Sequence, residues 1–186
     1  MRVLSSPARQ ELLDVLARMG TVSLTELGAV LGRPADGLYY HVRLLQRRGL
    51  VRSAGSRVVR GRREQLFRTV APQFGLRYAA APSPRAQAVT DVVGSMLRLG
   101  GRDFRRALAA AGNRLEGPDR DVWAMRTTGW LLPSQVRRVN RMILELSKQT
   151  TRNEPGGRLY SVTVLLTPLN HRANRTGRRP RRKAAP

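Results

Sequence analysis

The sequence contains no cysteine and has little lysine. The absence of cysteine excludes disulfide bonds, thiolate metal sites and catalytic thiols, and it is compatible with a reducing compartment. Lys148 and Lys183 are the two lysines among 35 basic residues, so arginine carries nearly all of the positive charge. Acidic residues number 12, which leaves a formal net charge of +23. A charge of this size favours a polyanionic partner.

Long apolar runs and aromatic residues are scarce as well. Hydrophobic residues make up 41% of the chain and aromatic residues 5%, which is sufficient for a core of leucine, valine and alanine. No window supplies the roughly 18 apolar residues of a membrane span, and residues 1–7 lack the apolar centre of a signal peptide. We therefore expect a globular, cytoplasmic protein with no membrane partner.

Catalytic and ligand-binding motifs are missing too. Gly94, Gly100 and Gly101 do not form a phosphate-binding loop after a predicted strand, and no Ser-His-Asp or paired-carboxylate arrangement has supporting spacing. The two histidines, His41 and His171, lie far apart in the sequence. We expect no enzymatic activity, no metal site and no cofactor.

The first 50 residues have the pattern of three helices separated by tight turns. A Ser-Pro pair at residues 6–7 is typical of a helix start, and an apolar stripe then runs to Gly20. The segment 23–26, Ser-Leu-Thr-Glu, matches a capping box that opens a short helix ending at Gly32. A third helix is expected over residues 34–48. The spacing predicts a helix-turn-helix whose third helix reads DNA.

The third predicted helix has one apolar face and one polar face. Leu38, Val42 and Leu45 repeat at spacings of four and three, so they form the buried stripe. His41 borders this stripe and either packs there or contacts DNA. The candidate DNA-contacting residues on this helix are Asp36, Gly37, Tyr39, Tyr40, Arg43 and Arg47. Arg43 is the best candidate for a base contact.

A hairpin with a basic tip follows the third helix. Extended runs over residues 50–59 and 65–70 flank the segment 60–63, Arg-Gly-Arg-Arg. We predict a β-wing, with DNA contacts from its arginine-rich segment 57–63 to phosphates or to the minor groove. The candidate residues are Arg57, Arg60, Arg62 and Arg63. The alternative interpretation is a solvated turn with no binding role.

The second half of the chain predicts a further domain. Residues 79–83 have the composition of a linker, and residues 84–169 are expected to form an α+β domain for dimerisation or effector binding. A Ser-Pro pair at residues 83–84 starts a helical pattern that Gly100-Gly101 interrupts, so one bent helix and two short helices are both open.

Two strands and a helix are expected within this domain. Residues 122–128 are compatible with a short strand, and residues 159–167, rich in β-branched side chains, predict a second strand. Pro133 begins a helix whose apolar stripe contains Val136, Val139, Ile143 and Leu146. Trp123, Met125 and Trp130 either line an effector pocket or belong to the core.

The last segment, 170–186, is basic throughout and has no apolar periodicity. We expect it to be disordered when free. Its seven basic residues favour sequence-independent phosphate contacts; the alternatives are RNA, an acidic protein or no specific role.

The first 70 residues resemble the ArsR-type winged-helix transcriptional regulators. The similarity is carried by residues 4–9 (Leu-Ser-Ser-Pro-Ala-Arg), 27–32, 39–45 (Tyr-Tyr-His-Val-Arg-Leu-Leu) and 49–51 (Gly-Leu-Val). It implies dimers that insert the third helix of each subunit into successive major grooves, with the wings on flanking backbone or minor groove. Metal sensing, which occurs in this family, requires cysteine and histidine clusters that this sequence lacks.

These features together predict a mainly α protein with a small β-wing. Residues 1–78 form a winged helix-turn-helix domain and residues 84–169 an α+β domain. The expected function is that of a bacterial sequence-specific transcriptional regulator, a homodimeric repressor that binds double-stranded DNA. A small-molecule effector is a further candidate partner. The main alternative is a nucleoid-type or RNA-binding protein that uses the same charge without sequence discrimination.

Overall fold

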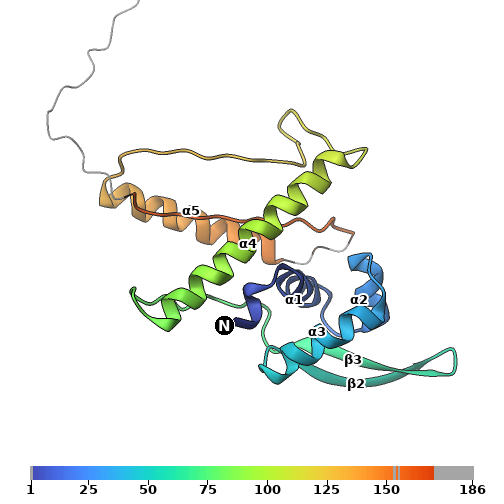
Figure 1. Cartoon of the computed structure of the whole chain (residues 1–186). Helices are drawn as coiled ribbons and strands as arrows, with labels where there is room; N and C mark the ends of the chain where they lie inside the picture. The colour runs from blue at the N-terminus through green and yellow to red at the C-terminus, as the bar shows by residue number, and fades with distance from the viewer. Residues whose placement is uncertain (1, 153, 155, 170–186) are drawn as a thin grey trace, which may run out of the picture.

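The computed structural model describes residues 2–152, 154 and 156–169, and Figure 1 shows how their elements are arranged. The disordered tail predicted over residues 170–186 lies outside the described residues. The elements in chain order are the 3-10 helix η1 (Arg2–Ser5), α1 (Pro7–Met19), β1 (Val22–Ser23), α2 (Leu24–Leu31), α3 (Ala35–Arg47), β2 (Val51–Val59), β3 (Arg62–Thr69), α4 (Pro84–Ala109) and α5 (Pro133–Thr151).

Residues 2–69 fold as a winged helix-turn-helix. Three helices pack beside a three-stranded antiparallel sheet in the order β1-β3-β2, and the β2–β3 hairpin projects from the helices as the wing (Figure 1). The predicted third helix agrees with α3 to within one residue at each end. The short strand β1 was not predicted. It has only two residues, which pair with Phe67 and Leu66 of β3, and two residues are too few to show the alternation of apolar and polar side chains that marks a strand.

The core of this unit joins all three helices to the sheet. Its best-buried side chains are Leu12, Leu16, Leu27, Leu38, Val42, Leu45 and Phe67, each at most 2% exposed. The apolar spacings of the sequence therefore predict the buried faces of α1 and α3 correctly. In α2, Leu27 is fully buried, whereas Val30 is 53% exposed. It lines a cavity instead of the core.

Helix α4 is continuous through Gly100-Gly101 and packs against η1 and α1. The Ser83 hydroxyl caps its start by accepting a hydrogen bond of 3.1 Å from the Ala86 backbone. The side chain of Gln10, buried on α1, donates to the carbonyl oxygens of Leu4 at 2.7 Å and Val92 at 3.0 Å. One amide thus ties η1, α1 and α4 together.

The predicted strands of the second half are wrong. Neither 122–128 nor 159–167 forms a strand, although both run as extended chain in the opposite direction to α5 (Figure 1). Their side chains favour extended backbone, but a strand also requires a hydrogen-bonded neighbour, and none lies within the described chain. The described part of 84–169 therefore holds two helices and two extended segments, and not an α+β sheet domain.

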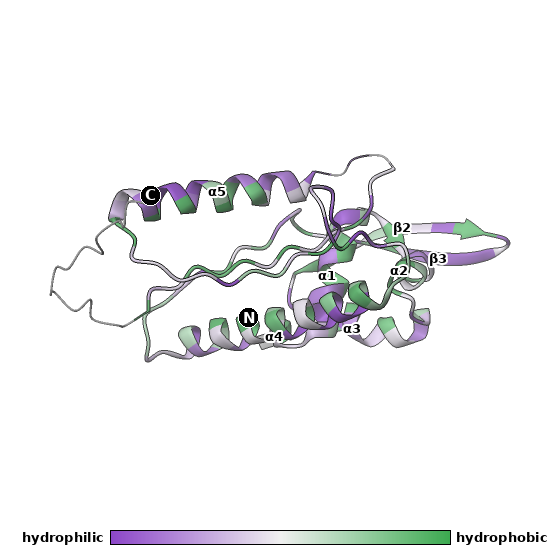
Figure 2. Ribbon diagram, turned by 90° about the horizontal axis from the view of Figure 1, so that it is seen from above, coloured by the Kyte–Doolittle hydropathy of each residue, from purple (hydrophilic) through white to green (hydrophobic). Residues whose placement is uncertain are grey.

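Helix α5 exposes the apolar stripe that its sequence predicts. Val136, Val139 and Ile143 are only partly buried and Leu146 is 40% exposed. In Figure 2 the extended segments run between α4 and α5, so the two helices do not pack directly on each other. Within the part of the chain that the structure describes, no helix has the length and apolar character to traverse a bilayer.

Candidate nucleic-acid interface

The outward face of α3 carries the polar and aromatic residues that the sequence pattern assigned to DNA. Tyr39 and Tyr40 are 50% and 68% exposed, and Asp36, Gly37, Arg43 and Arg47 are exposed as well. The Arg43 guanidinium lies 5.7 Å from the centre of the Tyr39 ring, a cation–π distance. The buried stripe on the other side of the helix fixes this face outward.

The approach of α3 to α2 depends on a glycine that the sequence analysis missed. Gly28 is buried in α2, and a Cβ atom there would lie 2.5 Å from the carbonyl oxygen of Arg33. The Gly28 carbonyl also accepts a 2.9 Å hydrogen bond from the Arg33 backbone. Only glycine leaves room for this turn, so Gly28 sets the position at which α3 begins.

The start of α2 is fixed by the predicted capping box. The Glu26 backbone donates to the Ser23 hydroxyl at 3.3 Å, and the Glu26 carboxylate accepts from the Ser23 backbone at 2.8 Å. Glu26 is also the partner of Arg57 in the wing, with 2.8 Å between guanidinium and carboxylate. The hydrogen bond from the Ser23 backbone, followed by the Arg57 contact, lowers the pKa of Glu26.

Arg57 differs from the other predicted wing residues because two carboxylates already hold it. Its guanidinium lies 2.8 Å from Glu26 and 3.2 Å from Glu64 on β3. These contacts tie the wing to the first turn of α2. Arg57 is therefore better suited to orienting the wing than to contacting phosphate itself.

The remaining wing arginines lie in the hairpin turn and at the start of β3. Arg60 and Gly61 form the two-residue turn, both with positive φ (50° and 77°), a geometry typical of hairpin loops that follow the strand twist. Arg62 and Arg63 are exposed at the start of β3, so they belong to the strand and not to the loop. Arg63 donates a 2.9 Å hydrogen bond to the Ser56 hydroxyl.

His41 was expected either to pack beside the apolar stripe of α3 or to contact DNA. It is half-buried, its ring meets the Tyr40 ring edge-on at 5.7 Å, and its Nδ1 atom is buried with no hydrogen-bond partner in the described structure. Burial, followed by the nearby Arg9 and Arg33 charges, lowers its pKa. A neutral histidine that packs beside the interface agrees with these surroundings.

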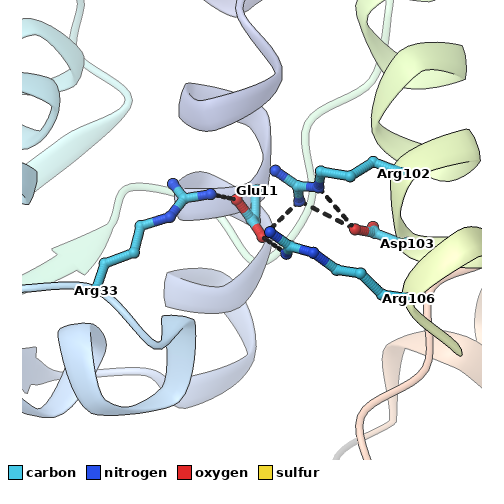
Figure 3. A network of polar contacts seen from close by, with 5 residues as sticks. All are labelled: Glu11, Arg33, Arg102, Asp103 and Arg106. Carbon is cyan, nitrogen blue, oxygen red and sulfur yellow. Dashed lines mark hydrogen bonds and ion pairs between the residues drawn. The ribbon is translucent and has the colours of Figure 1, made fainter. Parts of the chain in front are cut away.

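A network of charges connects this interface to α4 (Figure 3). The Glu11 carboxylate on α1 accepts hydrogen bonds from Arg33, in the turn before α3, and from Arg102 on α4 at 2.6 Å. Arg102 also contacts Asp103, and Arg106 lies 4.0 Å from Glu11. The Glu11 side chain is only 14% exposed, so this carboxylate is shielded from solvent, whereas Arg106 is 64% exposed.

A cavity of about 1110 Å³ lies beside this network, between α1, α4 and the two extended segments. Trp123 lines it, whereas Met125 and Trp130 do not. The alternative in which these three residues belong to the core is wrong, since they are 66%, 79% and 73% exposed. The Arg120 guanidinium stacks 4.2 Å from the centre of a Trp123 ring.

Comparison with known proteins agrees with this geometry. Residues 4–54, which span α1, α2, α3 and the first residues of β2, match a family described as a helix-turn-helix domain. ArsR-type regulators share this family. The search of curated proteins returned no match. The first part of the chain is therefore a helix-turn-helix domain, and such a domain indicates a DNA-binding regulator.

Proposed function

We propose that the protein is a sequence-specific transcriptional regulator of the ArsR-like winged-helix type. In this proposal α3 enters the major groove and the wing arginines contact the backbone or the minor groove. The observation that carries it is the outward face of α3, where exposed Tyr40 and Arg43 stand opposite the buried Leu38–Val42–Leu45 stripe. Such a face offers a guanidinium for bidentate contact with guanine at a position the core holds firmly.

The charge distribution supports the same docking. Arg60, Arg62 and Arg63 are exposed on the hairpin that flanks α3, and none of them makes an ion pair within the described residues. They are therefore available to phosphates, whose release of counterions drives much of protein–DNA affinity. The ion pairs of Arg57 with Glu26 and Glu64 keep the hairpin that carries them in one orientation.

We infer further that the protein acts as a homodimer and represses by occluding promoters. A dimer places two recognition helices about one helical turn apart, so its site is an inverted repeat. An effector, in this proposal, binds in the cavity beside α4. Its binding should change the fluorescence of the parent protein and leave that of a Trp123→Phe variant nearly unchanged.

The experiment that tests the proposal selects bound sequences from a random duplex pool at roughly 200 mM salt, where purely electrostatic binding is strongly weakened. Enrichment of an inverted repeat with half-sites one helical turn apart would support a dimeric regulator. Binding that disappears as salt rises, with no enriched motif, would instead indicate a nucleoid-type protein without sequence discrimination.

A promoter carrying the selected repeat then tests repression. Transcription from it should fall when the protein is added, and a promoter with a scrambled repeat should be unaffected. Increased transcription from the intact repeat would identify an activator.

A further inference from the structure

The two extended segments of the second half, residues 122–132 and 158–169, make almost no backbone hydrogen bonds within the described structure. Between Val122 and Leu131, and again from Arg158 to Leu169, no backbone N–H or C=O makes a backbone hydrogen bond within the described structure. Residues 159–167 nevertheless have the β-branched composition of a strand. A segment of this kind has its backbone groups open for pairing with a strand, as the edge of a sheet has.

The same segments expose a large apolar surface. Their large hydrophobic side chains that are at least 41% exposed are Trp123, Met125, Trp130, Leu131, Leu132, Leu159, Tyr160, Val162, Val164, Leu165, Leu166 and Leu169. Three of the twelve are aromatic, and each of these covers roughly 150 to 250 Å². Together with the nine aliphatic side chains, at about half exposure, the set presents on the order of 1,000 Å². A standard interface buries about 800 Å² on each partner. The exposed area is thus sufficient for a stable dimer.

We propose that these segments form the dimer interface, in which the strand-forming run 159–167 pairs antiparallel with the same run of a second copy. The inference rests on the proposed dimeric regulator and names the surface that makes the dimer. Pairing of this kind satisfies the open backbone groups and covers the apolar side chains in one step. Symmetric association requires a self-complementary patch, and a strand that pairs antiparallel with its own copy meets that requirement.

The distribution of charge selects a second copy as the partner. The whole chain carries a formal net charge of +23, so most of its surface repels another copy. Of charged side chains, residues 158–169 contain only Arg158, which lies 3.9 Å from the Asp121 carboxylate, and residues 122–132 contain only Arg126. These segments are therefore where two copies can approach with the least like-charge repulsion. An acidic partner protein, by contrast, would be expected to bind where the arginines are.

Proline substitution tests the pairing directly. Val164→Pro and Leu165→Pro each remove a backbone donor that has no backbone acceptor in the described chain, so the winged helix should stay folded. Only alternate N–H groups of a strand point at a given neighbour. We therefore expect one of the two variants to raise the dimer dissociation constant by at least about tenfold, measured by sedimentation. Val164→Ala and Leu165→Ala keep the N–H group and serve as matched controls.

Cross-linking tests the same pairing without perturbing the backbone. The parent has no cysteine, so single cysteines can be introduced one at a time at positions 160–166, with Glu116→Cys as a collisional control. An antiparallel pair across a two-fold axis predicts disulfide-linked dimers concentrated at one or two positions. A flat profile equal to the control, or a dimer unaffected by both prolines, would overturn the inference.

These outcomes are distinguishable from failure of the proposed function. If the prolines dissociate the dimer but the parent selects no DNA motif, the interface stands and the regulator proposal fails. If the parent is monomeric at all concentrations yet selects a single half-site, sequence recognition stands and the interface inference fails.

Discussion

The Arg102 guanidinium on α4 lies 2.6 Å from one carboxylate oxygen of Glu11, while the other oxygen of Glu11 accepts a hydrogen bond from Arg33. Arg33 sits in the turn that leads into α3. A single carboxylate on α1 therefore contacts both the second half of the chain and the turn that positions the recognition helix (Figure 3). Displacement of α4 would alter the contacts that Glu11 makes with this turn.

Removing the charge of Glu11 should destabilise the fold. In Glu11→Gln, Arg33 and Arg102 keep their shielded positions but lose their common counter-charge, so we expect a loss of about 1 to 3 kcal/mol in the free energy of unfolding. Urea denaturation at pH 7 measures it. Glu116→Gln, at an exposed position with no ion pair in the described structure, should have little effect. Equal stability of the two variants would show that the network contributes nothing.

The same substitution at two glycines should have opposite effects. Gly28→Ala brings a methyl group against the Arg33 carbonyl, which overpacks the turn and should cost about 1 to 3 kcal/mol. Gly37→Ala adds a methyl group in open space within α3 and should stabilise the helix by about 0.5 to 1 kcal/mol. Thermal unfolding followed by circular dichroism compares them. A stable Gly28→Ala protein would mean that α2 and the turn can separate without cost.

Asp14 should make stability depend on pH. Burial raises its pKa from 3.8 to about 6, with Asp103 and Glu11 adding to the shift and Arg18 opposing it. The native state thus holds a proton that the unfolded chain releases between about pH 4 and 6, so stability falls as pH rises through this window. Asp14→Asn lacks this titration and should be the more stable protein at pH 7.5. The gain should be at most about 1 kcal/mol, because the side chain is also exposed to solvent in the cavity.

The decisive measurement is how the difference in the free energy of unfolding between the parent and Asp14→Asn changes with pH. Parent and Asp14→Asn should converge as the pH falls below 3.8, where Asp14 is neutral in the unfolded chain as well as in the native state. Asp119→Asn, an exposed control, should follow the parent throughout. A constant difference from pH 4 to 7.5 would show that packing, and not titration, separates the two proteins.

Arg43 should contribute to discrimination between DNA sequences. Loss of a bidentate base contact in Arg43→Ala should cost about 1 to 3 kcal/mol on the selected site and reduce the preference for that site over mutated ones. Binding titrations on matched and single-substitution duplexes measure both quantities. Arg137→Ala, which removes an exposed arginine of α5 outside the winged helix and outside the proposed dimer interface, should leave the preference intact. Equal losses on all duplexes would assign Arg43 to phosphate contact.

Two wing arginines should differ in their effect on salt dependence. Arg60 is exposed at the hairpin tip, so Arg60→Ala should reduce the slope of log K against log salt by about 1. Arg57 is already neutralised by Glu26 and Glu64, so Arg57→Ala should change the slope less. Identical slopes for the two variants would indicate that Arg57 leaves its carboxylates when DNA binds.

Local signals in the sequence explain why the winged helix could be predicted. The capping box at Ser23 and Glu26 and the spacing of Leu38, Val42 and Leu45 each act within one or two helical turns. Such features are visible without knowing the fold. The contact of Arg57 with Glu26 could not be predicted, because it joins segments separated by 31 positions and depends on how the hairpin twists.

The second half could be predicted less well, because its structure depends on which other segments lie beside it and not on local sequence alone. Residues 159–167 have the composition of a strand and an extended course, yet composition does not say whether another segment lies alongside. Similarly, the stripe on α5 indicates burial, but Leu146 remains 40% exposed in the single chain. The need for Gly28 was missed for a related reason, since a close backbone approach leaves no pattern around the glycine.

The hydrogen bonds of the Gln10 amide determine which fragments of the chain can fold on their own. Because it bonds to both Leu4 and Val92, the contiguous packed unit extends from η1 through α4, and the sequence boundary near residue 80 does not separate two independent bodies. A fragment ending at residue 78 would leave the Gln10 amide and the neighbouring face of α1 in water, whereas one ending after α4 keeps them covered. The smallest soluble piece that retains the DNA-facing helix should therefore end near residue 110.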